Sequence, residues 1–224
     1  ARGLGRLIEK PVAPVAGAFP CPVSVTIDDD TLAQAPLFTG RLIRGVRDGP
    51  SPQWLQDRLR RIGLRPISAL VDVTNFFTYD MNRPLHVFDA DKVRGNLRVH
   101  RAKGGETLVG LDEKEYSFEP GAVVISDDEE IESIAGIMGG LRTGCTAETT
   151  NVFLEAAVWD DVQIAMTGRA TKINSDARYR NERGIDPEFN APAIELATQM
   201  IMELCGGEPS DVVSAGEVPD TARA

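Results

Sequence analysis

The residue in this chain best suited to proton transfer at neutral pH is a histidine, and the chain has only two. One of them, His86, lies in the segment Arg83-Pro84-Leu85-His86-Val87-Phe88-Asp89, which follows an amphipathic stretch ending in Asn75. A lone histidine is more often a satisfied core or surface residue than a catalytic one. His86 is therefore a candidate whose meaning depends on the residues around it.

A second candidate is Glu155, which interrupts the apolar run from Val152 to Val158. A carboxylate in such a run either lies on the solvent-facing side of an edge strand or points into a cavity, where it needs a hydrogen-bond partner. The sequence leaves both readings open.

Three glycines, Gly136, Gly139 and Gly140, end a strand-like segment. Glycines at such a place usually permit a bulge or turn, and the functional alternative is close approach of a ligand to the backbone. The chain has no G-x-x-x-x-G-K-[ST] and no G-x-G-x-x-G motif, so nothing indicates a cradle for ATP or a dinucleotide.

Metal and hydrolase-triad chemistry are poorly supported. The three cysteines are widely spaced, and together with two histidines they do not form a zinc-ligand pattern or a disulfide framework. The acidic runs 28–30 and 127–130 are typical of solvated loops. Ser175, Asp176 and His86 lack a G-x-S-x-G elbow, so a serine-hydrolase triad is disfavoured.

The charge of the chain is negative overall but uneven. The formal net charge of −10 argues against a general nucleic-acid coat protein. Residues 40–103 carry 13 Lys/Arg and 6 Asp/Glu, whereas residues 104–164 carry 2 and 14. This asymmetry either disappears in three dimensions or gives a basic face for an RNA backbone.

The periodicity predicts a mixed α+β fold with a substantial antiparallel component. Helices are expected from Ser51 to Gly63, over 67–77 and over 193–204, and strands over 23–27, 97–101, 107–110, 115–118, 122–126, 134–138 and 152–158. We expect a linker and first strand in residues 1–39, the main domain in 40–210, and a C-terminal strand or linker in 211–224. Linker-like ends suggest a piece of a longer protein.

Neither a membrane nor export is indicated. No apolar run approaches the roughly 20 residues needed to span a bilayer, and the N-terminus has no signal-peptide pattern. We therefore expect a cytoplasmic protein.

Six stretches taken in order resemble the editing domain of the bacterial phenylalanyl-tRNA synthetase β subunit. They are Gly49-Pro50-Ser51-Pro52-Gln53-Trp54-Leu55; Arg65-Pro66-Ile67 with Val71-Asp72-Val73-Thr74-Asn75; Pro84-Leu85-His86-Val87-Phe88-Asp89; Ala135-Gly136-Ile137-Met138-Gly139-Gly140; Phe153-Leu154-Glu155-Ala156-Ala157; and Glu182-Arg183-Gly184-Ile185-Asp186-Pro187. The resemblance covers about residues 40–210.

The resemblance implies an unusual β-sandwich core with flanking helices, and hydrolysis of tyrosine wrongly esterified to tRNA(Phe). It assigns the tyrosine hydroxyl to Glu155 and the attacking water to His86, with Thr74 and Asn75 lining the same end of the site. It makes Gly136 and Gly139 a wall of the pocket and places Ser175 and Ala177 in its lining. The implied partners are the 3′ end of tRNA(Phe) and the α subunit of an α2β2 synthetase. No cofactor is expected in this piece, while ATP and Mg2+ would serve the parent ligase.

Two positions depart from the family pattern. Asn82 stands where glycine is usual, and Asn181 replaces an aromatic residue, a change expected to cost packing near Ser175 and Ala177. Two alternatives therefore stay open. One is a non-catalytic tRNA-binding or scaffold module, and the other is a free-standing homologue that acts on another aminoacyl ester.

Overall fold

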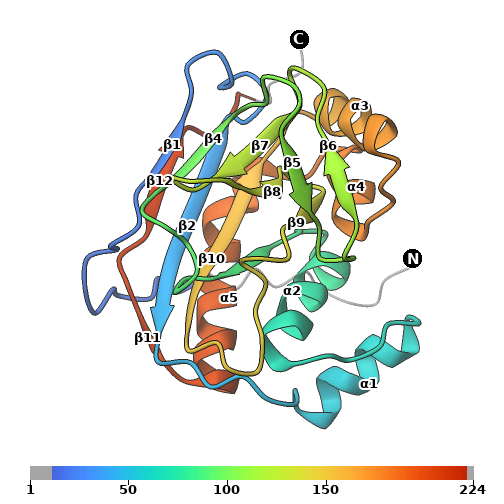
Figure 1. The fold of residues 1–224 in the computed structure, drawn as a ribbon. Helices are drawn as coiled ribbons and strands as arrows, with labels where there is room; N and C mark the ends of the chain where they lie inside the picture. Colours follow the sequence, from blue (N-terminus) through green and yellow to red (C-terminus); the bar gives the residue numbers. More distant parts are fainter. Residues whose placement is uncertain (1–11, 221–224) are drawn as a thin grey trace.

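The computed structural model describes residues 12–220, in which two β-sheets and a layer of helices pack together (Figure 1). The first sheet has the order β1-β4-β7-β8-β9, and the second the order β11-β2-β10-β3 with β12 also paired to β2. The strands of the first sheet are β1 (Val25–Ile27), β4 (Leu97–Arg101), β7 (Val123–Ser126), β8 (Ile131–Ile134) and β9 (Met138–Gly139). Those of the second are β2 (Leu37–Arg44), β3 (His86–Asp89), β10 (Asn151–Val158), β11 (Glu208–Pro209) and β12 (Val213–Gly216). A separate hairpin joins β5 (Thr107–Val109) and β6 (Glu115–Ser117).

The alternation of side chains along β10 explains why both of its faces are buried. Phe153 and Ala157 belong to the core between the two sheets, where they meet residues of the first sheet such as Val99 and Ile125. Val152, Leu154 and Ala156 point the other way, into a second core. A strand covered on both faces reads as a continuous apolar run, as this one does.

Helices α2 (Ala69–Asp80) and α5 (Asn190–Cys205) cover the outer face of the second sheet (Figure 1). Leu70, Val73 and Phe77 of α2 and Ile194 and Ile201 of α5 are fully buried there. The layers are therefore helices, second sheet and first sheet.

Three shorter helices lie outside this helix layer. They are α1 (Gln53–Arg61), α3 (Asp161–Thr171) and α4 (Asp176–Asn181), followed by a 3-10 turn at Pro187–Phe189. Asp160 caps α3 by accepting from Gln163 N, and Ser175 caps α4 by accepting from Arg178 N. Helix α1 packs beside α2 at the lower end of the molecule in Figure 1.

A buried ion pair ties the described N-terminal segment to the layers. Arg41 of β2 donates to Glu195 of α5 at 3.1 Å and to Val15 O at 2.7 Å. Glu195 also accepts from Val15 N at 2.7 Å. Because the Arg41 side chain is only 3% exposed, it depends on these partners.

The α+β expectation is confirmed, with two packed sheets and flanking helices. The three predicted helices are present with boundaries shifted by a few residues. The strand predicted over 134–138 is wrong, because residues 135–137 turn the chain between β8 and β9. Gly136 has a φ of +66°, which favours a turn over a strand. Strands β2 and β3 and helices α3 and α4 were not predicted.

The segments predicted to flank the main domain on each side pair with its strands. Strand β1 pairs in parallel with β4, and β12 pairs with β2 over Val213–Gly216. The boundaries at residues 39 and 211 stay predictions, and residues 1–11 and 221–224 lie outside the described part of the chain.

Candidate functional site

His86 and Glu155 are direct neighbours across two paired strands. In the antiparallel pairing of β3 with β10, His86 is the partner of Glu155. Side chains of directly opposed residues share a face, with Cβ atoms about 4.5–5.5 Å apart. Each lies two residues from a phenylalanine on its own strand, Phe88 or Phe153, and so shares its face of the sheet. Both phenylalanines lie in the core between the sheets. The two candidates therefore point together into the space between the sheets.

Glu155 is buried in the cavity between the sheets and is not on a solvent-facing edge, because β10 lies between β2 and β3. The residue is 5% exposed, and its Oε2 atom is buried with no hydrogen-bond partner. Burial raises the pKa of Glu155 to about 8, so its carboxyl is mostly protonated at pH 7. It therefore offers a neutral carboxyl to whatever fills the cavity.

The imidazole of His86 is also held uncharged. Its Nε2 atom is buried without a partner, and burial lowers the pKa of His86 to about 4. The ring packs edge-on against Phe88, with ring centroids 4.4 Å apart. On another side it lies against Gly139, where an added Cβ would be 2.3 Å from His86 Cε1. Gly139 is thus the residue that leaves room for the imidazole.

The loop before β3 is fixed by a buried arginine. Arg83 is 1% exposed and donates to Ala157 O, to Asn190 Oδ1 and to Asp186 O. Asn82, where the family usually has glycine, has a φ of +50°. Asparagine tolerates this left-handed conformation better than most residues, which explains how it can replace glycine here.

Helix α4 closes the cavity with Ala177 and Asn181, which are one helical turn apart. Asn181 is 2% exposed and donates from Nδ2 to Gly136 O at 2.8 Å, while its Oδ1 has no partner. The amide therefore bonds to the turn before β9, and α4 stays attached to that turn without an aromatic ring at this position. Ser175 lies just outside the lining. It caps α4 and donates to Ile137 O at 2.7 Å.

The turn before β9 depends on Gly136 for a packing reason. A Cβ at this position would lie 2.6 Å from Trp159 Cδ1. Gly136 therefore admits the indole of Trp159, which also lines the cavity. Trp159 was not predicted from the sequence. It comes directly after β10 and four residues after Glu155, and the alternation of the strand would place both side chains on the same face.

The resulting cavity has a volume of about 160 Å³. It is lined by Pro84, Leu85, His86, Leu111, Ser133, Gly136, Ile137, Met138, Gly139, Glu155, Trp159, Ala177 and Asn181. Five of the eight residues proposed from the sequence are in this set. They come from β3, β10, α4 and the segment 136–139 that turns into β9, so the fold assembles the site from four separate segments.

Thr74, Asn75 and Ser175 are not part of the lining. Thr74 and Asn75 lie half-buried on α2, in the layer that covers the outer face of the second sheet. The hydroxyl of Thr74 donates to Val71 O at 2.8 Å. Their proposed role at the reacting end of a substrate stays a prediction.

No group of three or more His, Cys, Asp or Glu side chains within residues 12–220 is arranged to hold a metal ion. In the same part of the chain, no helix has both the length and the apolar composition needed to cross a membrane. The chemistry of the cavity is that of two uncharged titratable groups and one amide, all with an unpartnered polar atom.

Comparison with known proteins identifies the family of the chain. The model of the B3/4 domain family matches residues 34–206, most of the chain. The chain belongs to the B3/4 domain family. It is 71% identical over its whole length to a phenylalanine–tRNA ligase β subunit of Ruegeria pomeroyi, and 64% identical to that of Cereibacter sphaeroides. In both cases the chain spans 28% of the length of the relative.

A solved structure shares the fold of this B3/4 domain at low sequence identity. It is an N-terminal fragment of the phenylalanyl-tRNA synthetase β subunit from Pyrococcus horikoshii, with a TM-score of 0.50 and 15% identity. The match covers 70% of this chain and 50% of the other. At this identity the likeness concerns the fold.

Proposed function

We propose that this B3/4 domain is part of a phenylalanine–tRNA ligase β subunit and that its cavity hydrolyses the ester of tyrosine wrongly attached to tRNA(Phe). The observation that carries this proposal is the pairing of His86 with Glu155, two uncharged groups that both direct an unpartnered atom into one cavity. Buried polar atoms are normally paired, so atoms without partners mark a place where a ligand supplies them. The relatives named as phenylalanine–tRNA ligase β subunits support the choice of substrate.

Glu155 would read the hydroxyl that distinguishes tyrosine from phenylalanine. The phenolic O–H donates to Oε2, which otherwise has no partner. Phenylalanine leaves this acceptor unpaired, at a cost of about 1–3 kcal/mol. A pocket that only accommodates a hydroxyl cannot discriminate strongly, whereas one that bonds to it can.

His86 would act on the water that attacks the ester. Since the imidazole is neutral at pH 7, it has a lone pair that can accept a proton from water. The water oxygen bonds to the ester carbonyl carbon, the bond to the ribose oxygen breaks, and the proton passes to that oxygen. The products are free tyrosine and uncharged tRNA. Because its pKa is low, His86 is a weak base and contributes mainly by orienting the water. An aminoacyl ester is labile, so an oriented water is enough to speed its hydrolysis.

The proposal places the 3′ end of tRNA(Phe) at the mouth of the cavity. It also makes the parent protein a cytoplasmic partner of an α subunit in an α2β2 assembly, as the resemblance implies. ATP and Mg2+ are assigned to other parts of that enzyme, because aminoacyl ester hydrolysis consumes only water.

The test is deacylation of tyrosyl-tRNA(Phe) and phenylalanyl-tRNA(Phe) by the 224-residue chain and by the full-length ligase. We expect Glu155→Ala to lose the preference for the tyrosyl ester by at least tenfold. We expect His86→Ala to slow hydrolysis of the tyrosyl ester about 10²-fold, because the attacking water loses the group that orients it.

Two matched controls separate these effects from general damage. His100→Ala removes the other histidine, which bonds to Ser126 away from the cavity, and Glu148→Ala removes an exposed glutamate. Both should hydrolyse the tyrosyl ester as the unchanged protein does. If the full-length ligase with Glu155→Ala still prefers the tyrosyl ester, the proposed role of the cavity is wrong.

A further inference from the structure

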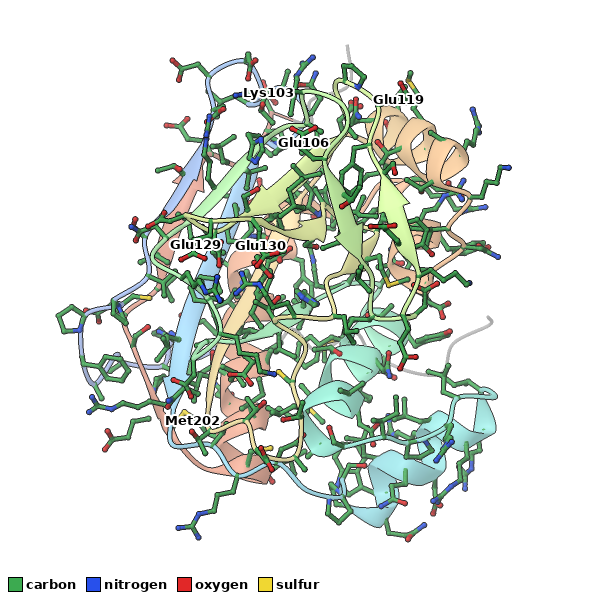
Figure 2. All side chains as sticks on the ribbon, viewed as in Figure 1. Lys103, Glu106, Glu119, Glu129, Glu130 and Met202 are labelled. Carbon is green, nitrogen blue, oxygen red and sulfur yellow. The ribbon has the colours of Figure 1, made fainter. Side chains whose placement is uncertain are left out.

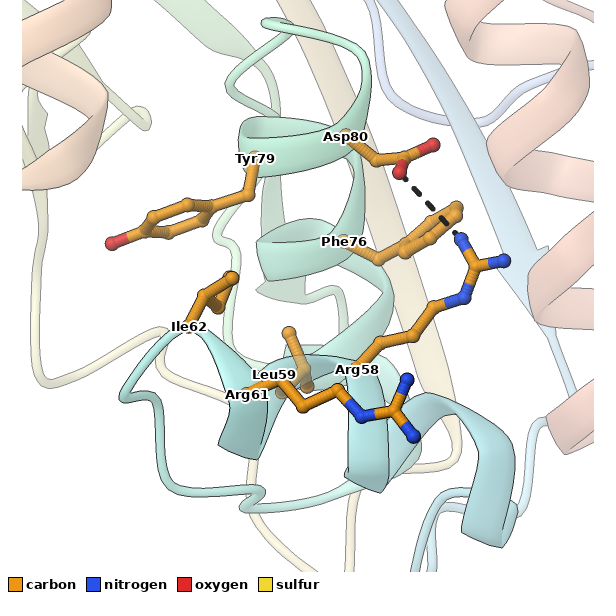
Figure 3. Close-up of a pocket in the computed structure, with 7 residues that line it drawn as sticks. All are labelled: Arg58, Leu59, Arg61, Ile62, Phe76, Tyr79 and Asp80. Carbon is orange, nitrogen blue, oxygen red and sulfur yellow. Dashed lines mark ion pairs between the residues drawn. The ribbon is translucent and has the colours of Figure 1, made fainter.

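A hollow of about 370 Å³ lies between α1 and α2, outside the cavity of Glu155 (Figure 3). Leu59 forms its floor and is buried. Tyr79 and Ile62 stand on one side, and Phe76 lies on the other beside Arg58. The hollow thus presents two aromatic rings about one helical turn apart on α2, with arginines on the facing helix.

We propose that this hollow binds the single-stranded 3′ segment of the RNA that carries the aminoacyl group. The inference rests on the proposed function, because it takes an RNA ester as the ligand of the neighbouring cavity. Single-stranded RNA is held by stacking its bases on aromatic rings and by arginines that pair with phosphates, and the hollow offers both.

The charge of this region suits a phosphate backbone although the chain as a whole is acidic. The last turn of α1 carries Arg58, Arg60 and Arg61. Arg58 pairs with Asp80 at 3.6 Å, which neutralises the one carboxylate in the hollow. Arg61 is exposed and forms no ion pair with any residue of the range 12–220, so its charge is available.

The acidic residues of the chain gather elsewhere. Glu106, Glu119, Glu129 and Glu130, from the segment rich in carboxylates, lie on the part of the molecule built by the first sheet and the β5–β6 hairpin (Figure 2). Helix α1 projects from the opposite end. Some basic residues of the range 40–103 lie at this acidic end, such as Arg94, which pairs with Glu129, and Lys103 beside Glu106. The arginines of α1 lie away from it, so a phosphate chain near α1 avoids the acidic end.

Helix α4 connects the hollow to the cavity. Its residues Ala177 and Asn181 line the cavity, while Arg180 stacks on Tyr79 with its guanidinium carbon 4.2 Å from the ring centre. Exposed Tyr179 continues the surface, covered by Arg183 at 3.6 Å. A strand of RNA whose last nucleotide is esterified at the cavity can thus cross α4 over arginine and tyrosine planes and reach the hollow.

A binding measurement with RNA that carries no amino acid tests this surface independently of hydrolysis. The probe is a 5′-fluorescein-labelled RNA of ten nucleotides ending in CCA, titrated with the 224-residue chain and followed by fluorescence anisotropy. We expect Arg61→Gln and Tyr79→Leu each to raise the Kd by about five- to tenfold. Arg61→Gln should also lower the slope of log K against log salt by about 0.7, since one phosphate contact is lost.

The matched control is Arg60→Gln, which removes an arginine from the same helix. Arg60 bonds to Gln56 and Asp57 and does not line the hollow, so its loss should change the Kd less than twofold. Melting temperatures of all variants check that they are folded, since Arg60 and Arg61 are exposed but Tyr79 is half-buried under Arg180. A duplex RNA of the same length should bind at least tenfold more weakly than the single strand.

Equal increases of the Kd in Arg60→Gln and Arg61→Gln would overturn the proposal, because they would show general electrostatic attraction of RNA to α1 without a defined site. Absence of RNA binding at any salt concentration would overturn it too, and would leave the hollow to a protein partner. Neither outcome bears on the role of Glu155. Conversely, Glu155→Ala could keep the preference for the tyrosyl ester while Arg61→Gln weakens RNA binding. That result would reject the editing site and support the RNA surface.

Discussion

At the scale of single residues, the unusual feature is a glutamate on the middle of a buried strand with an unpartnered oxygen. Burial of an unpaired polar atom costs about 1–3 kcal/mol, a large fraction of the stability of a domain. Such a cost is commonly found where a ligand completes the bonding. Asn181 and His86 add further unpartnered atoms to the same wall.

The raised pKa of Glu155 predicts a specific dependence of stability on pH. Its carboxyl binds a proton more tightly in the folded protein (pKa about 8) than in the unfolded chain (about 4.3), so this residue makes the protein less stable as the pH rises towards 8. The lowered pKa of His86 acts in the opposite direction, but below about pH 6.5. Between pH 6.5 and 8 the Glu155 effect dominates this pair and amounts to about 1–2 kcal/mol.

Urea unfolding of the unchanged protein and of Glu155→Gln at pH 6.5 and 8 measures this effect. The substitution should remove that loss of 1–2 kcal/mol, whereas Glu148→Gln, at an exposed position, should keep it. The same pH dependence in the unchanged protein and in Glu155→Gln would mean that this carboxyl titrates normally.

The family resemblance assigned His86 and Glu155 to one site, but the local sequence pattern by itself could not show that they are neighbours. Glu155 interrupts an apolar run, which marks it, yet a strand buried on both faces has no alternation to show which core it enters. The answer lies in its register with β3, a contact between residues 69 positions apart. Asn181 was noted for the ring it replaces, and only its bond to Gly136 shows what the amide does.

At the scale of elements, α4 is the piece that determines the shape of the cavity. It is six residues long, and short helices are marginal without tertiary support. Ser175 supplies that support twice, as the cap of α4 and as a donor to Ile137 O in the turn before β9. Its position outside the lining agrees with a positioning role for the cavity.

Ser175→Ala should therefore destabilise the protein by about 1–2 kcal/mol, the usual cost of a lost cap and one partly buried hydrogen bond. Faster hydrogen exchange at residues 177–181 would show that the loss is local to α4. Ser68→Ala is the matched control, because Ser68 precedes α2 without forming a side-chain cap. If both substitutions have the same effect, Ser175 does not hold α4 in place.

The helices with a clear apolar face could be predicted from sequence, and so could the short strands β5 and β6, whereas the eight-residue strand β2 and the helices α3 and α4 could not. The helix over 193–204 shows one apolar face, and the structure extends it to Asn190–Cys205. Helix α4 has too few residues to show a period, and the turn at 135–137 is apolar because it is buried. Apolar composition there was read as a strand, although Gly136 was the better signal.

At the scale of the whole molecule, the cavity exists because two sheets and a helix meet at one edge of the core. No local pattern predicts this meeting, since it depends on how the layers are held together. The Arg41–Glu195 pair is one such connection, joining β2, α5 and the segment around Val15.

We expect Glu195→Ala to lower the free energy of unfolding by about 3–5 kcal/mol, because it leaves a buried guanidinium without its counter-charge. Limited proteolysis should then cut faster near Val15. Glu208→Ala is the control, since its pair with Arg44 is exposed on both sides and is worth at most about 1 kcal/mol. If urea unfolding gives similar losses of free energy of unfolding for both variants, the burial of Arg41 does not make its ion pair more important than the exposed one.

The register between β3 and β10 also determines which genetic changes this domain can tolerate. Suppose that the codon for Phe153 is deleted and the strand after it shifts back by one residue to keep its pairing with β3. Glu155 is then still encoded, but it takes the place of Leu154 and its side chain points towards the helices. An in-frame deletion of one residue would thus act as a null allele of the site while both of its named residues are still encoded. Surveys that score only substitutions at His86 and Glu155 would count such a gene as functional.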